Sequence, residues 1–176
     1  AVLVPAGVLF GSSRAHLALR RMLIDENQLE AVVDLPPGVF KPYAGVATSI
    51  LIFSRGGGTE SVWFYRVEGD GFSLDDKRQV QPEFITRRDG GDREVTGPSN
   101  DLPDLLKRWQ NRAEQEDDMT GKYFHVLADV IRENDYDLSF NRYHETKYEA
   151  EEHDSPEQLI SELRKMEKEL SGNLDE

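Results

Sequence analysis

Residues 29–53 read LEAVVDLPPGVFKPYAGVATSILIF, and this stretch gives the first indication of the architecture. Its two ends, 29–35 and 46–53, are almost wholly apolar, and Pro36-Pro37-Gly38 ends the first of them. Short apolar runs that are bounded by turn residues are typical of buried strands. We therefore predict two buried strands, one in each apolar run, joined through a turn.

The residues on either side of this stretch continue the pattern. Residues 1–4 (AVLV) form another apolar run, and residues 62–67 (VWFYRV) form a fourth. Between the apolar runs at 1–4 and 29–35, Ser12 and Ser13 can cap a helix that begins near Arg14. Nearly continuous apolar strands that alternate with a helix predict a sheet covered on both faces, which is an α/β fold.

The second half of the chain contains fewer apolar runs. Residues 68–99 are rich in Gly, Asp and Arg and predict mostly loop. Acidic residues in a first turn predict a helix from Asp101 through Trp109. We also expect a short helix over 124–132 and a turn over 134–137.

The last predicted helix has the clearest local signals. Ser155 is a suitable N-cap, Pro156 stands at the first helical position, and Gln158 completes a capping box. The apolar positions that follow are spaced four, three and four residues apart, which gives a heptad seam of Leu159, Leu163, Met166 and Leu170. Such a seam suits packing on its own domain as well as packing with the helices of a partner.

The composition excludes several classes of protein. The 176 residues include no cysteine, which excludes a disulfide scaffold, thiol catalysis and cysteine-ligated zinc. The histidines are not closely spaced, so we expect no metal site. No apolar run approaches the roughly 20 residues that a membrane span needs, so we expect no membrane contact and a cytoplasmic location.

The net charge of −13 is distributed unevenly along the chain. Residues 1–112 carry 14 basic and 15 acidic side chains, whereas residues 113–176 carry 7 basic and 19 acidic ones. Nonspecific binding of nucleic acid depends on lysine and arginine. The acidic second region is therefore expected to contact protein rather than phosphate.

Several short motifs that could bind ligands are better explained as structure. Gly56-Gly57-Gly58 lacks the lysine and the following helix of a phosphate-binding loop, so we interpret it as a hairpin turn. The pairs Asp75-Asp76 and Asp117-Asp118 lack a spaced third metal ligand and predict solvated loops. No combination of Ser, His and Asp can be assigned as a catalytic triad.

Two groups of side chains could also meet DNA. Arg14, Arg20 and Arg21 could form a stripe that faces phosphates, but a solvated helix face is favoured. The aromatic residues at 63–65 (WFY) are consecutive, so they alternate between the faces of a strand and cannot form one stacking platform. Core packing is the favoured role for them.

Seven short motifs carry a resemblance to a known family. They are VLVPAGVLF at 2–10, LRRMLI at 19–24, LEAVVDLPPGVF at 29–40, VATSILIF at 46–53, DGFSLDDKR at 70–78, NDLPDLL at 100–106 and DYDLSFNRY at 135–143. In this order they resemble the second half of the catalytic domain of the modification subunit of type I restriction–modification systems. Members of that family are S-adenosylmethionine-dependent DNA methyltransferases that modify N6 of adenine.

The resemblance implies an organisation for the chain. It implies the second half of a Rossmann-like methyltransferase sheet at 1–68, a loop-rich extension with a helix at 69–112, and a mostly helical, acidic region for subunit assembly at 113–176. The family carries its glycine-containing cofactor motif and its Asn-Pro-Pro-Phe/Tyr motif upstream of the strand that matches residues 1–4. We therefore expect the catalytic residues upstream of Ala1 and none in this chain. We also expect S-adenosylmethionine to be bound mainly by residues outside the chain, and this fragment to be inactive alone.

The resemblance also points to residues that meet the substrate. In related adenine methyltransferases, an aromatic residue between the last two sheet strands packs against the flipped base, and Phe40 matches that position. Lys41 could meet a nearby phosphate, and Tyr43 is a second aromatic candidate. A buried plug beneath the strand end is the structural alternative for Phe40.

The family's assembly suggests a role for the last helix. Carboxy-terminal helices of the modification subunit pack on the DNA-specificity subunit, and restriction subunits join for cleavage. The resemblance therefore implies double-stranded DNA, a specificity subunit and a restriction subunit as partners, with the heptad seam at 159–170 as the interface. The alternatives are a stand-alone protein-interaction module without activity and a plain DNA-binding domain, which the charge disfavours.

Overall fold

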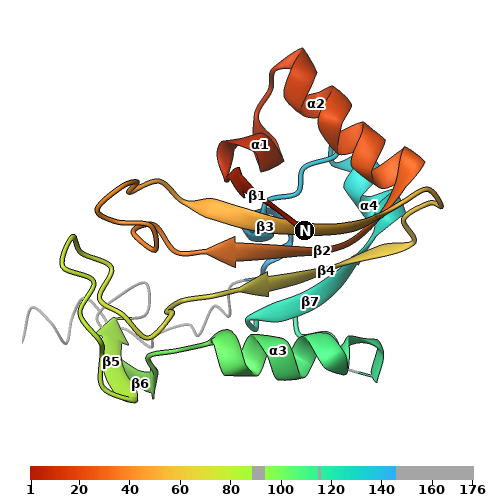
Figure 1. Cartoon of the computed structure of the whole chain (residues 1–176). Coiled ribbons are helices and arrows are strands. Elements are labelled where there is room, and N and C mark those ends of the chain that lie inside the picture. The colour runs from red at the N-terminus through yellow and green to blue at the C-terminus, as the bar shows by residue number, and fades with distance from the viewer. Residues whose placement is uncertain (89–93, 115, 146–176) are drawn as a thin grey trace, which may run out of the picture. The chain divides into compact units, whose positions relative to one another are not determined.

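A mixed five-stranded sheet forms the centre of the computed structural model, which describes residues 1–88, 94–114 and 116–145 (Figure 1). The strand order is β1-β3-β2-β4-β7. The strands are β1 (Val2–Pro5), β2 (Asn27–Leu35), β3 (Thr48–Arg55), β4 (Ser61–Arg66) and β7 (Tyr123–Leu127). All four apolar runs of the sequence are therefore strands, and the α/β class is confirmed.

Strands β1, β2 and β4 all point the same way. Strand β3 is antiparallel to both β1 and β2, and β2 is parallel to β4. The carboxyl ends of these three strands therefore lie at one edge of the sheet, which we call the carboxyl edge. Strand β7 pairs antiparallel with β4 and is the last strand of the sheet, at the opposite side from β1.

The Gly56-Gly57-Gly58 segment is not the hairpin turn that the sequence predicted. It connects β3 to β4, but β2 lies between these two strands, so the segment crosses the end of β2. Gly56 and Gly57 have φ angles of 77° and 83°, which suit glycine. The crossing is what makes β4 parallel to β2.

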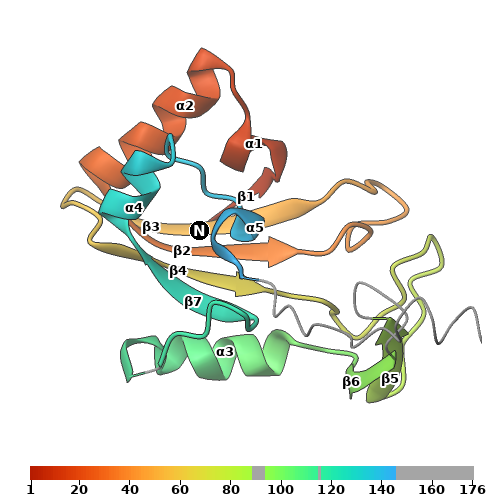
Figure 2. The same cartoon turned by 180° about the vertical axis from the view of Figure 1, so that it is seen from behind.

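Helices cover both faces of the sheet (Figures 1 and 2). One face carries α1 (Gly7–Phe10), α2 (Arg14–Arg21), a π-helical turn η1 (Met22–Glu26), α4 (Ala128–Glu133) and α5 (Phe140–Tyr143). The other face carries α3 (Leu102–Gln110), which is followed by a 3-10 turn η2 (Arg112–Glu114). The buried side chains of the sheet therefore divide into two clusters, one under each set of helices.

The start of α2 follows the prediction, but one of its arginines does not. Ser13 is the N-cap, and its hydroxyl accepts a hydrogen bond from the His16 backbone N–H at 3.2 Å. Arg20 is only 4% exposed. It donates hydrogen bonds to the carbonyl oxygens of Val8 and Gly11, at 3.0 and 2.9 Å. The predicted solvated face is therefore wrong for Arg20, which satisfies backbone groups of α1 and the residue after it.

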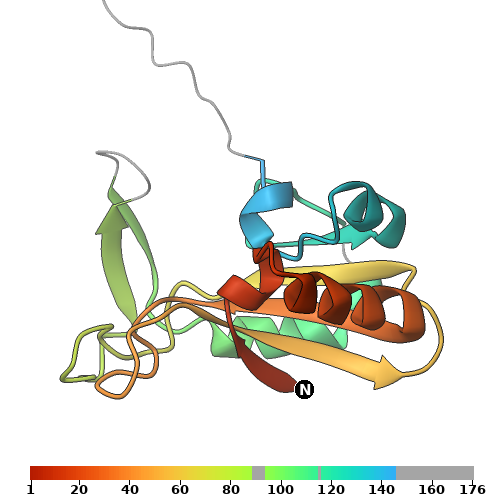
Figure 3. The same cartoon turned by 90° about the horizontal axis from the view of Figure 1, so that it is seen from above.

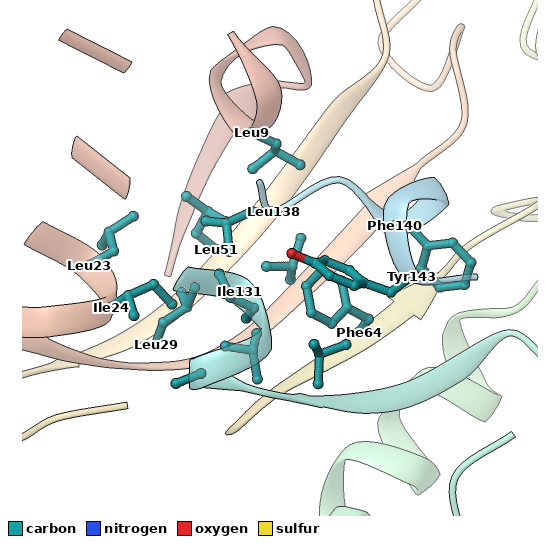
Figure 4. Packing of buried hydrophobic residues seen from close by; sticks show 14 of the residues in the cluster. Leu9, Leu23, Ile24, Leu29, Leu51, Phe64, Ile131, Leu138, Phe140 and Tyr143 are labelled. Carbon is teal, nitrogen blue, oxygen red and sulfur yellow. The ribbon is translucent and has the colours of Figure 1, made fainter. Parts of the chain in front are cut away.

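The larger cluster, which lies under α1, α4 and α5, combines aliphatic side chains with a group of packed aromatic rings (Figure 4). The Phe64 ring stacks on Phe124 at 5.6 Å, and Phe124 packs against Phe140 at 4.7 Å. On the opposite face, Trp63 packs against Trp109 of α3 at 5.7 Å. Residues 63–65 thus alternate between the two clusters and are all buried, as predicted.

Two predicted elements are corrected by the structure. The expected helix over 124–132 begins only at Ala128, because Phe124 and Val126 face the core and pair in strand β7 with β4. Within the predicted loop 68–99, β5 (Phe84–Arg88) and β6 (Glu94–Pro98) form a separate antiparallel hairpin.

The predicted helix from Ser155 lies outside the described residues. The helix from Leu102 and the turn over 134–137 are present as expected.

The core makes a direct prediction about stability. Replacing Phe64 by alanine should lower the free energy of unfolding by about 3–5 kcal/mol, because it leaves a cavity beside the rings of Phe124 and Tyr143. Denaturant titration followed by circular dichroism measures the change. Phe10→Ala, at a ring that is 57% exposed, is the control and should cost far less. Equal losses for the two variants would contradict the assignment of Phe64 to the core.

Candidate functional site

The turn over residues 36–45 leaves the carboxyl end of β2 and lies beside the other strand ends of the carboxyl edge (Figure 1). Its backbone is held by its own hydrogen bonds. The N–H of Lys41 donates to the Gly38 carbonyl at 3.1 Å, and the N–H groups of Tyr43 and Ala44 donate to the Phe40 carbonyl at 3.0 and 3.1 Å. The 36–45 turn is therefore an ordered structure that projects from the sheet.

The three predicted site residues lie together in the 36–45 turn. The Phe40 side chain is 37% exposed, so it is not the fully buried plug of the structural alternative. The Lys41 Nζ lies 3.4 Å from Oδ1 of Asp76, and Tyr43 is 96% exposed. The turn thus presents two aromatic rings and an ammonium group, of which the ammonium is paired with a carboxylate.

A second segment contacts the turn, and the sequence did not predict it. Gly38 has a φ of +96°, and a Cβ atom there would collide with the carbonyl oxygen of Leu74. Both the backbone angle and the lack of space mean that only glycine fits. The loop over residues 70–81 therefore packs directly against the 36–45 turn, and the Lys41–Asp76 ion pair is a second contact between them.

A partly buried carboxylate, that of Asp34, lies one residue before the end of β2. Oδ1 of Asp34 accepts a hydrogen bond from the Ser49 hydroxyl at 2.7 Å. Burial raises the pKa of Asp34, while the Ser49 hydrogen bond and the charge of Arg66 oppose the increase. Arg66 is paired with Asp34 in the strand register, and its guanidinium lies 4.0 Å from the centre of the Phe140 ring. Asp34 and Arg66 were not among the predicted site residues, although a carboxylate inside an apolar strand was a usable signal.

A hydrogen-bond network joins the end of β4 to α3. Asp101 is 2% exposed, and its Oδ2 accepts hydrogen bonds from the N–H groups of Glu68 and Gly69 at 2.7 and 3.2 Å. Its Oδ1 pairs with Lys122 Nζ at 2.9 Å. Tyr65 donates to Oδ2 of Asp104 at 2.8 Å, and burial raises its pKa. This network fixes the point at which the 70–81 loop leaves the sheet.

The described residues offer few sites for a ligand besides the 36–45 turn. They contain no group of three or more His, Asp or Glu side chains that could hold a metal ion. A cavity of about 580 Å³ lies between the 70–81 loop and β5–β6, and it is lined mainly by apolar side chains such as Phe72, Val80 and Phe84. Within the ranges given above, no helix is long and apolar enough to cross a membrane.

The sequence matches the N-6 DNA Methylase family over residues 1–152. The chain belongs to this family. Over 65 residues it is 45% identical to the methylase subunit of the type I restriction enzyme EcoEI from Escherichia coli, a match that covers 37% of this chain and 13% of that protein. The resemblance drawn from the seven motifs is therefore confirmed.

Solved structures of type I subunits share the fold of this N-6 DNA methylase chain. A chain from a structural study of type I R-M complex assembly and conformational transition superposes with a TM-score of 0.57 at 24% identity, covering 98% of this chain and 33% of that one. The EcoKI M protein gives 0.54 at 18% identity, covering 84% and 34%. A modification subunit from Vibrio vulnificus YJ016 gives 0.53 at 24% identity, covering 74% and 22%. The chain thus spans about a third or less of these relatives.

The expectation about catalytic residues concerns what lies upstream of Ala1. Ala1 itself is exposed and stands directly before β1, at the outer strand of the sheet. The placement of the catalytic residues upstream of Ala1 therefore stays a prediction.

The raised pKa of Asp34 predicts how stability depends on pH. A carboxyl whose pKa is raised by folding binds a proton more readily in the folded state, so its protonated form favours folding. The stability that Asp34 contributes is therefore complete below a pH of about 4, the pKa of an aspartate in the unfolded chain. It is lost as the pH rises from there through the pKa of Asp34 in the folded state. Asp34→Asn removes this loss and keeps an acceptor for Ser49. The melting temperature of the variant should therefore rise relative to the wild type between acidic and neutral pH.

Thermal unfolding over a pH series measures this difference. Asp129→Asn, at an exposed carboxylate on α4, is the matched control for removing one negative charge. Parallel curves for the wild type and Asp34→Asn would contradict the prediction.

Proposed function

We propose that this chain is part of a site-specific DNA methyltransferase of a type I restriction–modification system, which transfers a methyl group from S-adenosylmethionine to N6 of adenine. Membership of the N-6 DNA Methylase family and the identity to the EcoEI methylase subunit support this proposal. The observation that carries the site assignment is Phe40, a partly exposed ring on an ordered turn at the carboxyl edge. Open α/β sheets bind their ligands at this edge.

The sheet is proposed to be the second half of a Rossmann-like catalytic sheet. Strands β1, β2 and β4 share one direction, and helices cover both faces, as in sheets of that kind. The outer edge of β1 pairs with no strand among the described residues, and Val2 and Leu3 are exposed. We propose that the first half of the sheet continues from this edge.

The resembled family carries its cofactor motif upstream of the strand that matches residues 1–4. At the carboxyl edge of the described residues, the Asp34 carboxylate is partly buried and bonded to Ser49. We therefore assign the cofactor site, and the acceptors that orient the adenine amino group, to residues upstream of Ala1. On this proposal the chain alone does not catalyse methylation.

The contribution of this chain is to hold the substrate. An enzyme that modifies a base takes it out of the stack and holds it against aromatic or apolar surface. Phe40 supplies such a surface, and the exposed Tyr43 ring can extend it. Lys41 is within reach of a phosphate once DNA competes with Asp76 for its ammonium group, because an exposed ion pair of this kind is weak.

Substitution of Phe40 tests the proposed site. Stacking on an aromatic side chain is worth about 1–3 kcal/mol per base, so Phe40→Ala should lower kcat/KM for target DNA by about 5- to 150-fold in the complete methyltransferase. Phe40→Tyr keeps a ring and should retain most of the activity. Methylation assays with the target duplex measure the change.

The control is Phe53→Ala. Its ring is also 37% exposed, but Phe53 lies toward the carboxyl end of β3, which points away from the carboxyl edge. It should leave methylation unchanged. Normal activity of Phe40→Ala would remove the support for this site.

Assembly is proposed to depend on the acidic region. We assign Leu159, Leu163, Met166 and Leu170, which lie outside the described residues, to the interface with a specificity subunit, and we propose a cytoplasmic complex with double-stranded DNA and a restriction subunit. Deletion of residues 155–176 should release the specificity subunit in gel filtration. A complex that survives the deletion would contradict this interface.

A further inference from the structure

The 70–81 loop is ordered by hydrogen bonds among its own residues. Oδ1 of Asp75 accepts hydrogen bonds from the Ser73 hydroxyl at 2.8 Å, from the Lys77 N–H at 2.9 Å and from the Arg78 N–H at 3.3 Å. The Ser73 N–H donates to the Gln79 carbonyl at 2.7 Å, and the Gln79 N–H donates to the Ser73 hydroxyl at 2.9 Å. Asp75 is therefore the acceptor around which the loop closes.

The base of the loop is fixed to the rest of the molecule. Arg78 and Asp70, toward the two ends of the loop, form an ion pair that closes its base, and both side chains are largely buried. The N–H of Gly71 donates to the Ser99 carbonyl at 2.9 Å, so the loop is tied to the segment that leads into α3. An internally bonded loop on a fixed base can act as a rigid support.

The tip of this loop meets the 36–45 turn. The Leu74 carbonyl lies against the Cα of Gly38, and Asp76 lies beside Lys41. The two segments project side by side from the same end of the sheet (Figures 1 and 3). Residues 74 and 76 flank Asp75, so the hydrogen bonds of Asp75 fix both contacts.

We propose that the 70–81 loop positions the Phe40 ring, with Asp75 as the positioning residue. This inference rests on the proposed function, in which Phe40 packs against the flipped adenine. A ring held in its binding position loses little conformational entropy when the base arrives, so the bound state is favoured. Asp75 contacts neither the base nor the cofactor on this proposal. It acts through Leu74 and Gly38.

The test uses the complete methyltransferase complex. Asp75→Ala removes the central acceptor and should lower kcat/KM for target DNA about tenfold, a loss of the size expected when stacking on Phe40 weakens. The KM for S-adenosylmethionine should stay unchanged. Asp75→Asn keeps an oxygen acceptor and should restore most of the activity. Asp129→Ala, an exposed carboxylate on α4, should have no effect.

A double variant separates this inference from the proposed function. If Asp75 acts through Phe40, then Phe40→Ala with Asp75→Ala should be no worse than Phe40→Ala alone, whereas independent effects would multiply. Multiplied losses, or full activity of Asp75→Ala beside a defective Phe40→Ala, overturn the positioning role and leave the proposed function intact. Full activity of Phe40→Ala overturns the proposed role of Phe40, and with it this inference, while the methyltransferase proposal stands on the family match. Melting temperatures of all variants identify any loss that comes from misfolding.

Discussion

Strand β2 has to pair on both edges and pack on both faces at the same time, and the rest of the structure depends on this constraint. It is antiparallel to β3 and parallel to β4. An irregularity in the pairing with β3 between Leu29 and Ala31 lets Leu29 and Val32 face one cluster while Ala31 and Val33 face the other. A strand buried in this way has no freedom to slip in register. The position of its carboxyl end in the sheet is therefore fixed, and so is the start of the turn that follows.

The proposed site residues lie in the turn that follows this fixed strand end. The sheet positions the beginning of the 36–45 turn, and the 70–81 loop contacts it further along. The network around Asp101 in turn anchors that loop to β4 and α3. A chain of contacts thus runs from the buried core to the partly exposed Phe40 ring. Surface loops that carry binding residues on a rigid scaffold follow the same general arrangement.

The sequence was informative where local patterns determine structure. The apolar runs predicted β1 to β4, and Ser13 predicted the start of α2, because burial and capping act over a few residues. It failed for β7, since the run around Phe124 suits a helix as well as a strand until β4 is available as a partner. Arg20 was misassigned because the carbonyls that it satisfies come from α1 and the residue after it. Phe40 came from family resemblance, and no local pattern could show that Leu74 packs on Gly38.

The contact at Gly38 also has a consequence for how such proteins can be re-engineered. Position 38 has no room for a Cβ atom, and the atom that fills the space belongs to the backbone of Leu74, so no side-chain change can relieve the crowding. The turn and the loop therefore have to be exchanged together when segments are swapped between related proteins. A chimera that takes the 36–45 turn from a relative has to take that relative's counterpart of residues 70–81 with it, or the grafted turn meets a surface of the wrong shape.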